Sequence, residues 1–242
     1  MNPIIDNIAE IRNRMKQASL QFDRDPEEIK LLLATKTVSA DKIKVALESG
    51  ETLIGENRAQ ELRSKFMELE NTPHEKHFIG YLQTNKIKDL LRYGVTCIQS
   101  VDRIDLAQKL QDRLVFEKKE IDVFIQVNTS NEESKFGVSP DKAIELTKQV
   151  AEFPNIHIKG LMTIGLFSAE RKKMQACFKK LKNIQQQILE LNLENVEMRE
   201  LSMGMSHDLE IAIEEGSTMV RVGTAIFGKR KYADSYYWNE SR

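Results

Sequence analysis

The sequence predicts an α/β fold, a single (β/α)8 TIM barrel that occupies residues 1–242 as one domain and begins with an extra helix. Two observations lead to this prediction. Short apolar or β-branched runs alternate with amphipathic segments, and such alternation produces a mostly parallel sheet covered by helices. Eight units of roughly 30 residues suit a closed barrel, and a chain of 242 residues can form one as a single domain.

The extra helix is predicted at the start of the chain. Asn2 can cap it, and Pro3 suits its first turn because proline lacks an N–H group that would be unsatisfied there. Apolar side chains then recur at helical spacing, at Ile4, Ile8, Ile11 and Met15. The pattern indicates an amphipathic helix ahead of the first strand.

Eight runs are predicted to be the strands: 29–36, 52–55, 77–80, 96–100, 122–128, 159–165, 199–203 and 218–223. Helix signals separate them. Ser39 can cap a helix that Gly50 ends, and Ser206 can cap one that Gly216 ends. A serine followed by proline at 139–140 opens another helix.

A doubly wound open sheet is the rival fold. The sequence lacks G-x-G-x-x-G after the first strand and lacks G-x-x-x-x-G-K-[ST], so the nucleotide-binding signatures of that fold are missing. No Pro-, Gly- or Ser-rich linker divides the chain. The longest polar connection, residues 128–140, follows the fifth strand and is predicted to be a mobile loop over the functional face.

The composition predicts a cytoplasmic protein whose partner is a small molecule. Lys plus Arg number 36 and Asp plus Glu 37, which gives a formal net charge of -1 and no basic surface for nucleic acid or membrane. Two widely spaced cysteines indicate neither a disulfide framework nor a zinc site, and no apolar run is long enough to span a membrane. A closed barrel also has no sheet edge, so we expect a monomer.

Lys36 is the first candidate functional residue, because it ends the first apolar strand run and functional groups of such barrels stand at the C-terminal ends of strands. Burial lowers the pKa of an amine, and a neutral amine is the nucleophile that Schiff-base chemistry needs. A lysine at a strand end can also simply extend into solvent, so other residues must decide between the two interpretations.

The last two strand runs predict a phosphate site. Each run ends in small or hydroxyl-bearing residues: Ser202, Gly204 and Ser206 after the seventh, Gly223 and Thr224 after the eighth. Small residues let backbone N–H groups approach a phosphate, hydroxyls can donate to it, and barrels often bind phosphate at this position. The glycines could instead serve turns, and a serine could merely cap a helix.

Arg221 lies between Val220 and Val222 in the last strand run, so its side chain is predicted to point into the barrel. A buried guanidinium needs a partner. A carboxylate such as Glu56 or Glu200 is one option, and the ring nitrogen of a bound aromatic molecule is another. By contrast, Lys86 lies in an amphipathic segment and is predicted to face solvent.

Several motifs together resemble the pyridoxal phosphate homeostasis proteins, which look like the barrel domain of alanine racemase standing alone. The motifs span nearly the whole chain: ATK at 34–36, IGEN at 54–57, HFIG at 77–80 with LQTNK at 82–86, GLM at 160–162, LSMGMS at 201–206 and RVGTAIFG at 221–228. IGEN alone would be a weak signal, whereas the set is highly specific. The resemblance implies an alanine racemase N-terminal domain-like barrel.

The resemblance also implies a cofactor, pyridoxal 5'-phosphate, bound as a Schiff base on Lys36. It places Arg221 at the pyridine nitrogen and Asn57 near the ring. Ser202, Gly204, Ser206, Gly223 and Thr224 would surround the phosphate. It implies a role in cofactor homeostasis, with transient contact to apo-enzymes that use pyridoxal phosphate, and no catalytic residue.

Two enzyme hypotheses stay open beside this one. An amino-acid racemase or lyase could use Lys36 as its base, although racemization needs a second base, which alanine racemase takes from a further domain, and the chain ends about where that domain would begin. An aldolase-like barrel could form a Schiff base directly with a sugar phosphate. Arg221 argues mildly against the aldolase-like reading, since it would then have no ring to contact.

Overall fold

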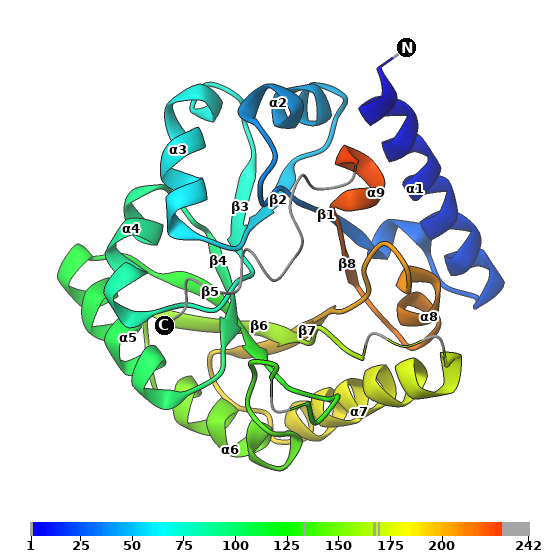
Figure 1. Ribbon diagram of the computed structural model, residues 1–242. Helices are drawn as coiled ribbons and strands as arrows, with labels where there is room; N and C mark the ends of the chain where they lie inside the picture. The colour runs from blue at the N-terminus through cyan, green and yellow to red at the C-terminus, as the bar shows by residue number, and fades with distance from the viewer. Residues whose placement is uncertain (1, 133, 167, 169, 229–242) are drawn as a thin grey trace.

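Eight parallel strands close into a barrel in the computed structural model, which describes residues 2–132, 134–166, 168 and 170–228. Each strand pairs with the next, and β1 pairs with β8. Figure 1 views the barrel roughly along its axis. The strands are β1 (Lys30–Ala34), β2 (Leu53–Glu56), β3 (Glu75–Phe78), β4 (Cys97–Val101), β5 (Ile121–Gln126), β6 (Ile156–Met162), β7 (Val196–Ser202) and β8 (Met219–Val222).

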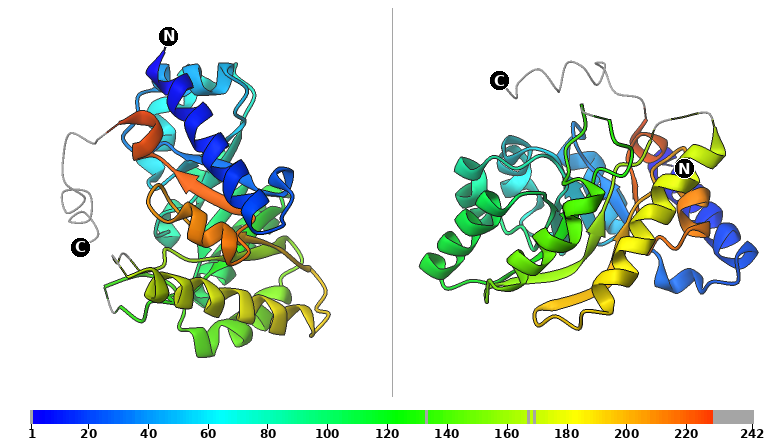
Figure 2. Two further views of the ribbon diagram at one scale, coloured as in Figure 1. Left: turned by 90° about the vertical axis from the view of Figure 1, so that its right-hand side faces the viewer. Right: turned by 90° about the horizontal axis from the view of Figure 1, so that it is seen from below.

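Helices surround the barrel on its outer side, as Figures 1 and 2 show. They are α1 (Pro3–Gln21), α2 (Ala40–Glu48), α3 (Ala59–Leu69), α4 (Ile87–Arg92), α5 (Ile104–Glu117), α6 (Pro140–Ala151), α7 (Arg171–Leu189), α8 (Leu209–Glu214) and α9 (Thr224–Phe227), with short 3-10 turns at Pro26–Glu28 and Thr84–Lys86. Within the described ranges, no helix is both long enough and apolar enough to cross a bilayer.

The core lies on both faces of the strands. Leu31 and Leu33 of β1 pack outward with the apolar stripe of α1, while Leu32 packs with Phe124 and Met219 inside the barrel. This alternation follows from the two-residue period of a strand. In β8 the same period places Arg221 on the inner face with Met219, as the sequence predicts.

The elements confirm the predicted fold class and the extra helix. Asn2 caps α1, since its Oδ1 accepts a hydrogen bond from the Ile4 N–H at 3.1 Å, and the four residues of the predicted stripe are buried. Ser39 and Ser139 hold the N-cap positions of α2 and α6. All eight predicted strand runs overlap a strand.

Two local predictions were wrong. Lys36 does not end β1, because the strand stops at Ala34 and Lys36 lies in the turn that follows. Ser206 does not cap α8, whose N-cap is Asp208. The Asp208 Oδ1 instead accepts a hydrogen bond from the Met205 N–H at 2.6 Å, so a turn over residues 205–208 separates Ser206 from the helix.

Candidate functional site

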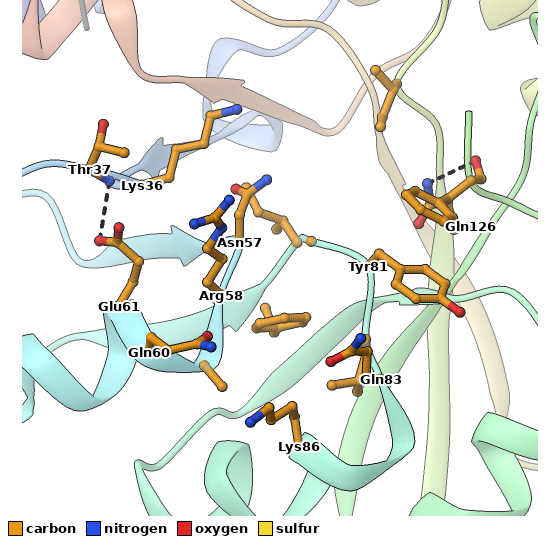
Figure 3. Close-up of a pocket in the computed structure, with 17 residues that line it drawn as sticks. Lys36, Thr37, Asn57, Arg58, Gln60, Glu61, Tyr81, Gln83, Lys86 and Gln126 are labelled. Carbon is orange, nitrogen blue, oxygen red and sulfur yellow. Dashed lines mark hydrogen bonds between the residues drawn. The ribbon is translucent and has the colours of Figure 1, made fainter. Parts of the chain in front are cut away.

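A cavity of about 170 Å³ opens at the C-terminal ends of the strands. Its walls come from the segments that follow β1, β2, β3, β5 and β6. Figure 3 shows polar side chains from these segments around it, among them Lys36, Asn57, Arg58, Gln83 and Lys86. It lies at the face where barrels of this kind carry their functional groups.

Lys36 and Asn57 line this cavity from neighbouring strands. Lys36 follows β1, Asn57 follows β2 directly, and the two strands pair through Ala34 and Gly55. Within the described residues, the Asn57 Oδ1 is buried and has no hydrogen-bond partner. Leaving a buried polar atom without a hydrogen-bond partner costs roughly 1–3 kcal/mol. A ligand that donates a hydrogen bond to the Asn57 Oδ1 would remove this cost, so the atom indicates a binding site.

The predicted phosphate residues gather at the ends of β7 and β8. Gly204 and Ser206 follow β7, whereas Gly223 and Thr224 follow β8. The Gly204 carbonyl accepts a hydrogen bond from the Arg221 N–H at 3.0 Å, which joins the turn after β7 to strand β8. Across the described part of the chain, no acceptor faces the backbone N–H groups of these four residues. They offer a set of unpaired donors.

Gly223 brings the two groups of residues together. A Cβ at this position would lie 2.8 Å from the Ala34 carbonyl oxygen, closer than side chains tolerate. The absence of a side chain therefore lets the end of β8 pack against the end of β1, two residues before Lys36. Because β7, β8, β1 and β2 are consecutive in the closed barrel, the predicted site residues occupy one continuous part of its mouth.

Arg221 is buried inside the barrel, and its partners are not the carboxylates considered in the sequence. Its Nη1 donates to the Ser202 Oγ at 2.8 Å and its Nη2 donates to the Thr163 carbonyl at 2.7 Å. Glu56 and Glu200 have lysine partners elsewhere. Burial lowers the pKa of Arg221 to about 10, which leaves the guanidinium protonated at neutral pH.

The Ser202 hydroxyl makes two hydrogen bonds in this arrangement. It accepts from Arg221 and donates to the Gln99 Oε1 at 2.7 Å. The Gln99 Nε2 lies 2.7 Å from the His77 Nδ1. Burial lowers the pKa of His77 to about 4, so the neutral ring accepts this hydrogen bond at Nδ1. The Ser202 hydroxyl thus orients Arg221, a role that the sequence analysis did not predict.

Three other residues near the cavity were also not identified in the sequence analysis. Lys86, expected to face solvent, lines the cavity because it belongs to the 3-10 turn that precedes α4. Tyr81 stacks on Phe136 with ring centroids 4.1 Å apart, which brings the loop after β5 to the cavity wall. That places the loop of residues 128–140 as predicted, and its mobility stays a prediction. Lys86, Tyr81 and Phe136 each lie in a segment that follows a strand, and this position was the sequence feature that could have identified them.

Comparison with known proteins identifies relatives over nearly the whole chain. Residues 4–231 match the family described as alanine racemase, N-terminal domain. The pyridoxal phosphate homeostasis protein of Aquifex aeolicus is 41% identical over 228 residues, which cover 94% of this chain and 98% of that protein.

Solved structures agree with this. The crystal structure of an unknown protein from Bifidobacterium adolescentis is 38% identical with a TM-score of 0.88, and the match covers 93% of this chain and 94% of the other. The structure of PipY from Synechococcus elongatus with pyridoxal phosphate bound is 28% identical with a TM-score of 0.80, and the match covers 93% of this chain and all of PipY.

Proposed function

Because this chain belongs to the pyridoxal phosphate homeostasis proteins, we propose that it binds pyridoxal 5'-phosphate on Lys36 and buffers or delivers the cofactor without catalytic turnover. One observation supports this proposal more strongly than any other. A lysine and an asparagine whose buried oxygen lacks a partner share one cavity, beside a group of unpaired backbone N–H donors. Both features fit this cofactor, which combines an aldehyde, a polar aromatic ring and a phosphate.

The residues divide into three functional groups in this proposal. Lys36 supplies the amine that condenses with the aldehyde, and Asn57 contacts the ring. The N–H groups and hydroxyls at Gly204, Ser206, Gly223 and Thr224 hold the phosphate, because closely spaced N–H donors favour a dianion. When bound, pyridoxal phosphate supplies an aldehyde reactive toward amines and a ring that can withdraw electrons.

Arg221 restrains that ring chemistry. A guanidinium is a donor only, and its two described hydrogen bonds leave other N–H groups to donate to a pyridine nitrogen. A nitrogen that accepts from a guanidinium stays unprotonated, so the ring withdraws electrons weakly. Ser202 keeps the guanidinium in place. This arrangement suits a protein that stores the cofactor more than one that uses it for turnover.

The partners in this proposal are few. The small-molecule cofactor is the ligand, and transient contact with apo-enzymes would pass it on. A monomer suffices for this role, because a closed barrel has no sheet edge that must pair with a second chain. We place this activity in the cytoplasm, where enzymes that use the cofactor are made.

Spectroscopy and chemical trapping test the cofactor site. We expect the purified protein, incubated with pyridoxal phosphate, to gain visible absorbance that Lys36→Ala abolishes. Borohydride reduction followed by peptide mapping should then place the adduct on Lys36. A protein that stays colourless with the cofactor yet is trapped by borohydride with a sugar phosphate would establish the aldolase-like alternative and end this proposal.

The absence of turnover needs its own measurement. The loaded protein is incubated with L-alanine in deuterated water, and exchange of the α-hydrogen is followed by mass spectrometry, with the Lys36→Ala protein as control. We expect both proteins to exchange at the same slow rate. Sustained exchange or racemization that depends on Lys36 would instead show an enzyme.

A further inference from the structure

The turn that carries Lys36 has a conformation that needs support. Thr37, the next residue, has a φ of 64° in the left-handed region. A β-branched residue is rarely found there, and such a conformation costs roughly 1–3 kcal/mol and persists only where the surroundings impose it. Some contact must therefore hold this turn.

Three side chains outside the turn contact the residues on either side of Lys36. The Lys65 Nζ donates to the Thr35 carbonyl at 2.9 Å, and the Glu56 Oε1 accepts from the Thr35 hydroxyl at 2.6 Å. On the other side, the Glu61 Oε2 accepts from the Thr37 N–H at 3.2 Å, the hydrogen bond drawn in Figure 3. Both neighbours of Lys36 are thus held by the same group of charges.

These three side chains also bind one another. The Lys65 Nζ lies 2.8 Å from the Glu56 Oε1 and 2.6 Å from the Glu61 Oε2. Lys65 and Glu56 are only 8% and 1% exposed, so each charge depends on the other for compensation. Burial raises the pKa of Glu56, while the ammonium of Lys65 opposes that rise. A group whose members depend on each other has few alternative arrangements and makes a rigid support.

We propose that Glu61, held in place by Lys65, is a positioning residue that keeps the Lys36 turn in one conformation and so slows the loss of bound cofactor. The inference rests on the proposed function, in which Lys36 holds the aldehyde. When water hydrolyses the bond to Lys36, it gives the aldehyde and the free amine. A correctly placed amine then condenses with the aldehyde again, with loss of that water, before the cofactor escapes, as expected for a reaction between groups held in place. A relaxed turn recaptures it less often.

Cofactor release to an external amine tests this proposal. Hydroxylamine takes the aldehyde as an oxime and returns Lys36 as the free amine, and the change in absorbance reports the rate. We expect Glu61→Ala to accelerate this reaction about tenfold, as the loss of one hydrogen bond to a charged group implies. Glu61→Gln keeps an oxygen that can accept from the Thr37 N–H and should stay within about twofold of the wild type.

Glu68→Ala provides the matched control. Glu68 lies on the same helix, α3, and is exposed, so its removal changes the charge equally without touching the turn. We expect the wild-type rate for this variant. The inference is overturned if Glu61→Ala behaves like Glu68→Ala, or if Glu61→Gln is as fast as Glu61→Ala.

Two further measurements show whether a negative result contradicts the proposed function or the positioning role of Glu61. If wild type and Lys36→Ala release the cofactor at the same rate, the proposed function fails rather than the positioning role. In the wild-type apo-protein, the Thr37 amide should exchange slowly with solvent, which requires no variant. Rapid exchange of that amide would show that Glu61 does not hold the turn.

Discussion

Arg221 shows how a single buried cation is stabilised without a carboxylate in hydrogen-bond contact. Its guanidinium donates to the Ser202 hydroxyl and to a carbonyl, and that hydroxyl in turn donates a hydrogen bond to the Gln99 Oε1. The chain of hydrogen bonds ends at His77, whose neutral ring accepts from Gln99. Each group therefore has one defined orientation, which the protonation state of His77 helps to set.

His77 should make stability depend on pH. Burial holds its pKa at about 4 in the folded protein, below the ordinary 6.5, so the unfolded chain binds more protons between these values. The contribution of His77 to the free energy of unfolding is therefore fully present above about pH 6.5 and is lost as the pH falls toward 4. We expect the free energy of unfolding to drop by about 2 kcal/mol from this group between pH 7 and pH 5.

Urea unfolding at the two pH values measures this drop. His77→Gln, whose side chain can still accept from Gln99 but cannot titrate, should lose that part of the dependence. His157→Gln, which replaces a less buried histidine, should keep it. An identical pH dependence in wild type and His77→Gln would contradict the prediction.

At the scale of elements, α1 does more than cover one side of the barrel. Arg14 forms an ion pair with Glu210 of α8, with 2.7 Å between its Nε and the Oε1, and its Nη2 donates to the Ser206 carbonyl at 3.1 Å. Asn7 donates to the Ile226 carbonyl of α9 at 2.9 Å. The helix thus contacts the turn at Ser206 and the short helix α9, which begins at Thr224.

Removing one of these contacts should weaken cofactor binding without unfolding the protein. We expect Arg14→Ala to lower the affinity for pyridoxal phosphate about threefold to tenfold, because the Ser206 turn loses a support that is partly exposed to solvent. Lys16→Ala, an exposed position on the same helix, removes the same charge and should leave the affinity unchanged. Equal affinities for Arg14→Ala and Lys16→Ala in a fluorescence titration would disprove this role of α1.

The fold was predictable from the sequence because strand and helix periods are local properties. The runs around Leu32 and Val220 are apolar enough to mark strands without knowledge of their neighbours. The support for Lys36 was not predictable in the same way. Lys65 and Glu61 lie far along the chain from it on a helix that is otherwise ordinary and amphipathic, and their proximity depends on how α3 packs against β1 and β2. Contacts between site residues of different helices and strands can be identified only from the tertiary structure.

At the scale of the whole molecule, cofactor binding should stabilise the entire barrel. The proposed site joins turns at both ends of the chain, so unfolding any part of it releases the ligand. A cofactor concentration 100 times the Kd should add about 2.7 kcal/mol to the free energy of unfolding. For a chain of this length, that raises the Tm by about 5–11 °C.

Thermal unfolding with and without cofactor checks this expectation, and Lys36→Ala should show a much smaller shift. Pyridoxine, which lacks both the aldehyde and the phosphate, is the matched ligand and should leave the Tm unchanged. A wild-type shift no larger than that of Lys36→Ala would contradict a covalent contribution to binding.

The pairing of β1 with β8 also has a consequence for biosynthesis. The ribosome releases β1 and the turn that carries Lys36 early, whereas β8, the strand that completes their surroundings, is synthesised much later. Until then, β1 has a neighbour on one side only, and the phosphate turns do not exist. Cofactor capture should therefore follow synthesis of β8 and the turn after it, and a nascent protein stalled before β8 should bind none.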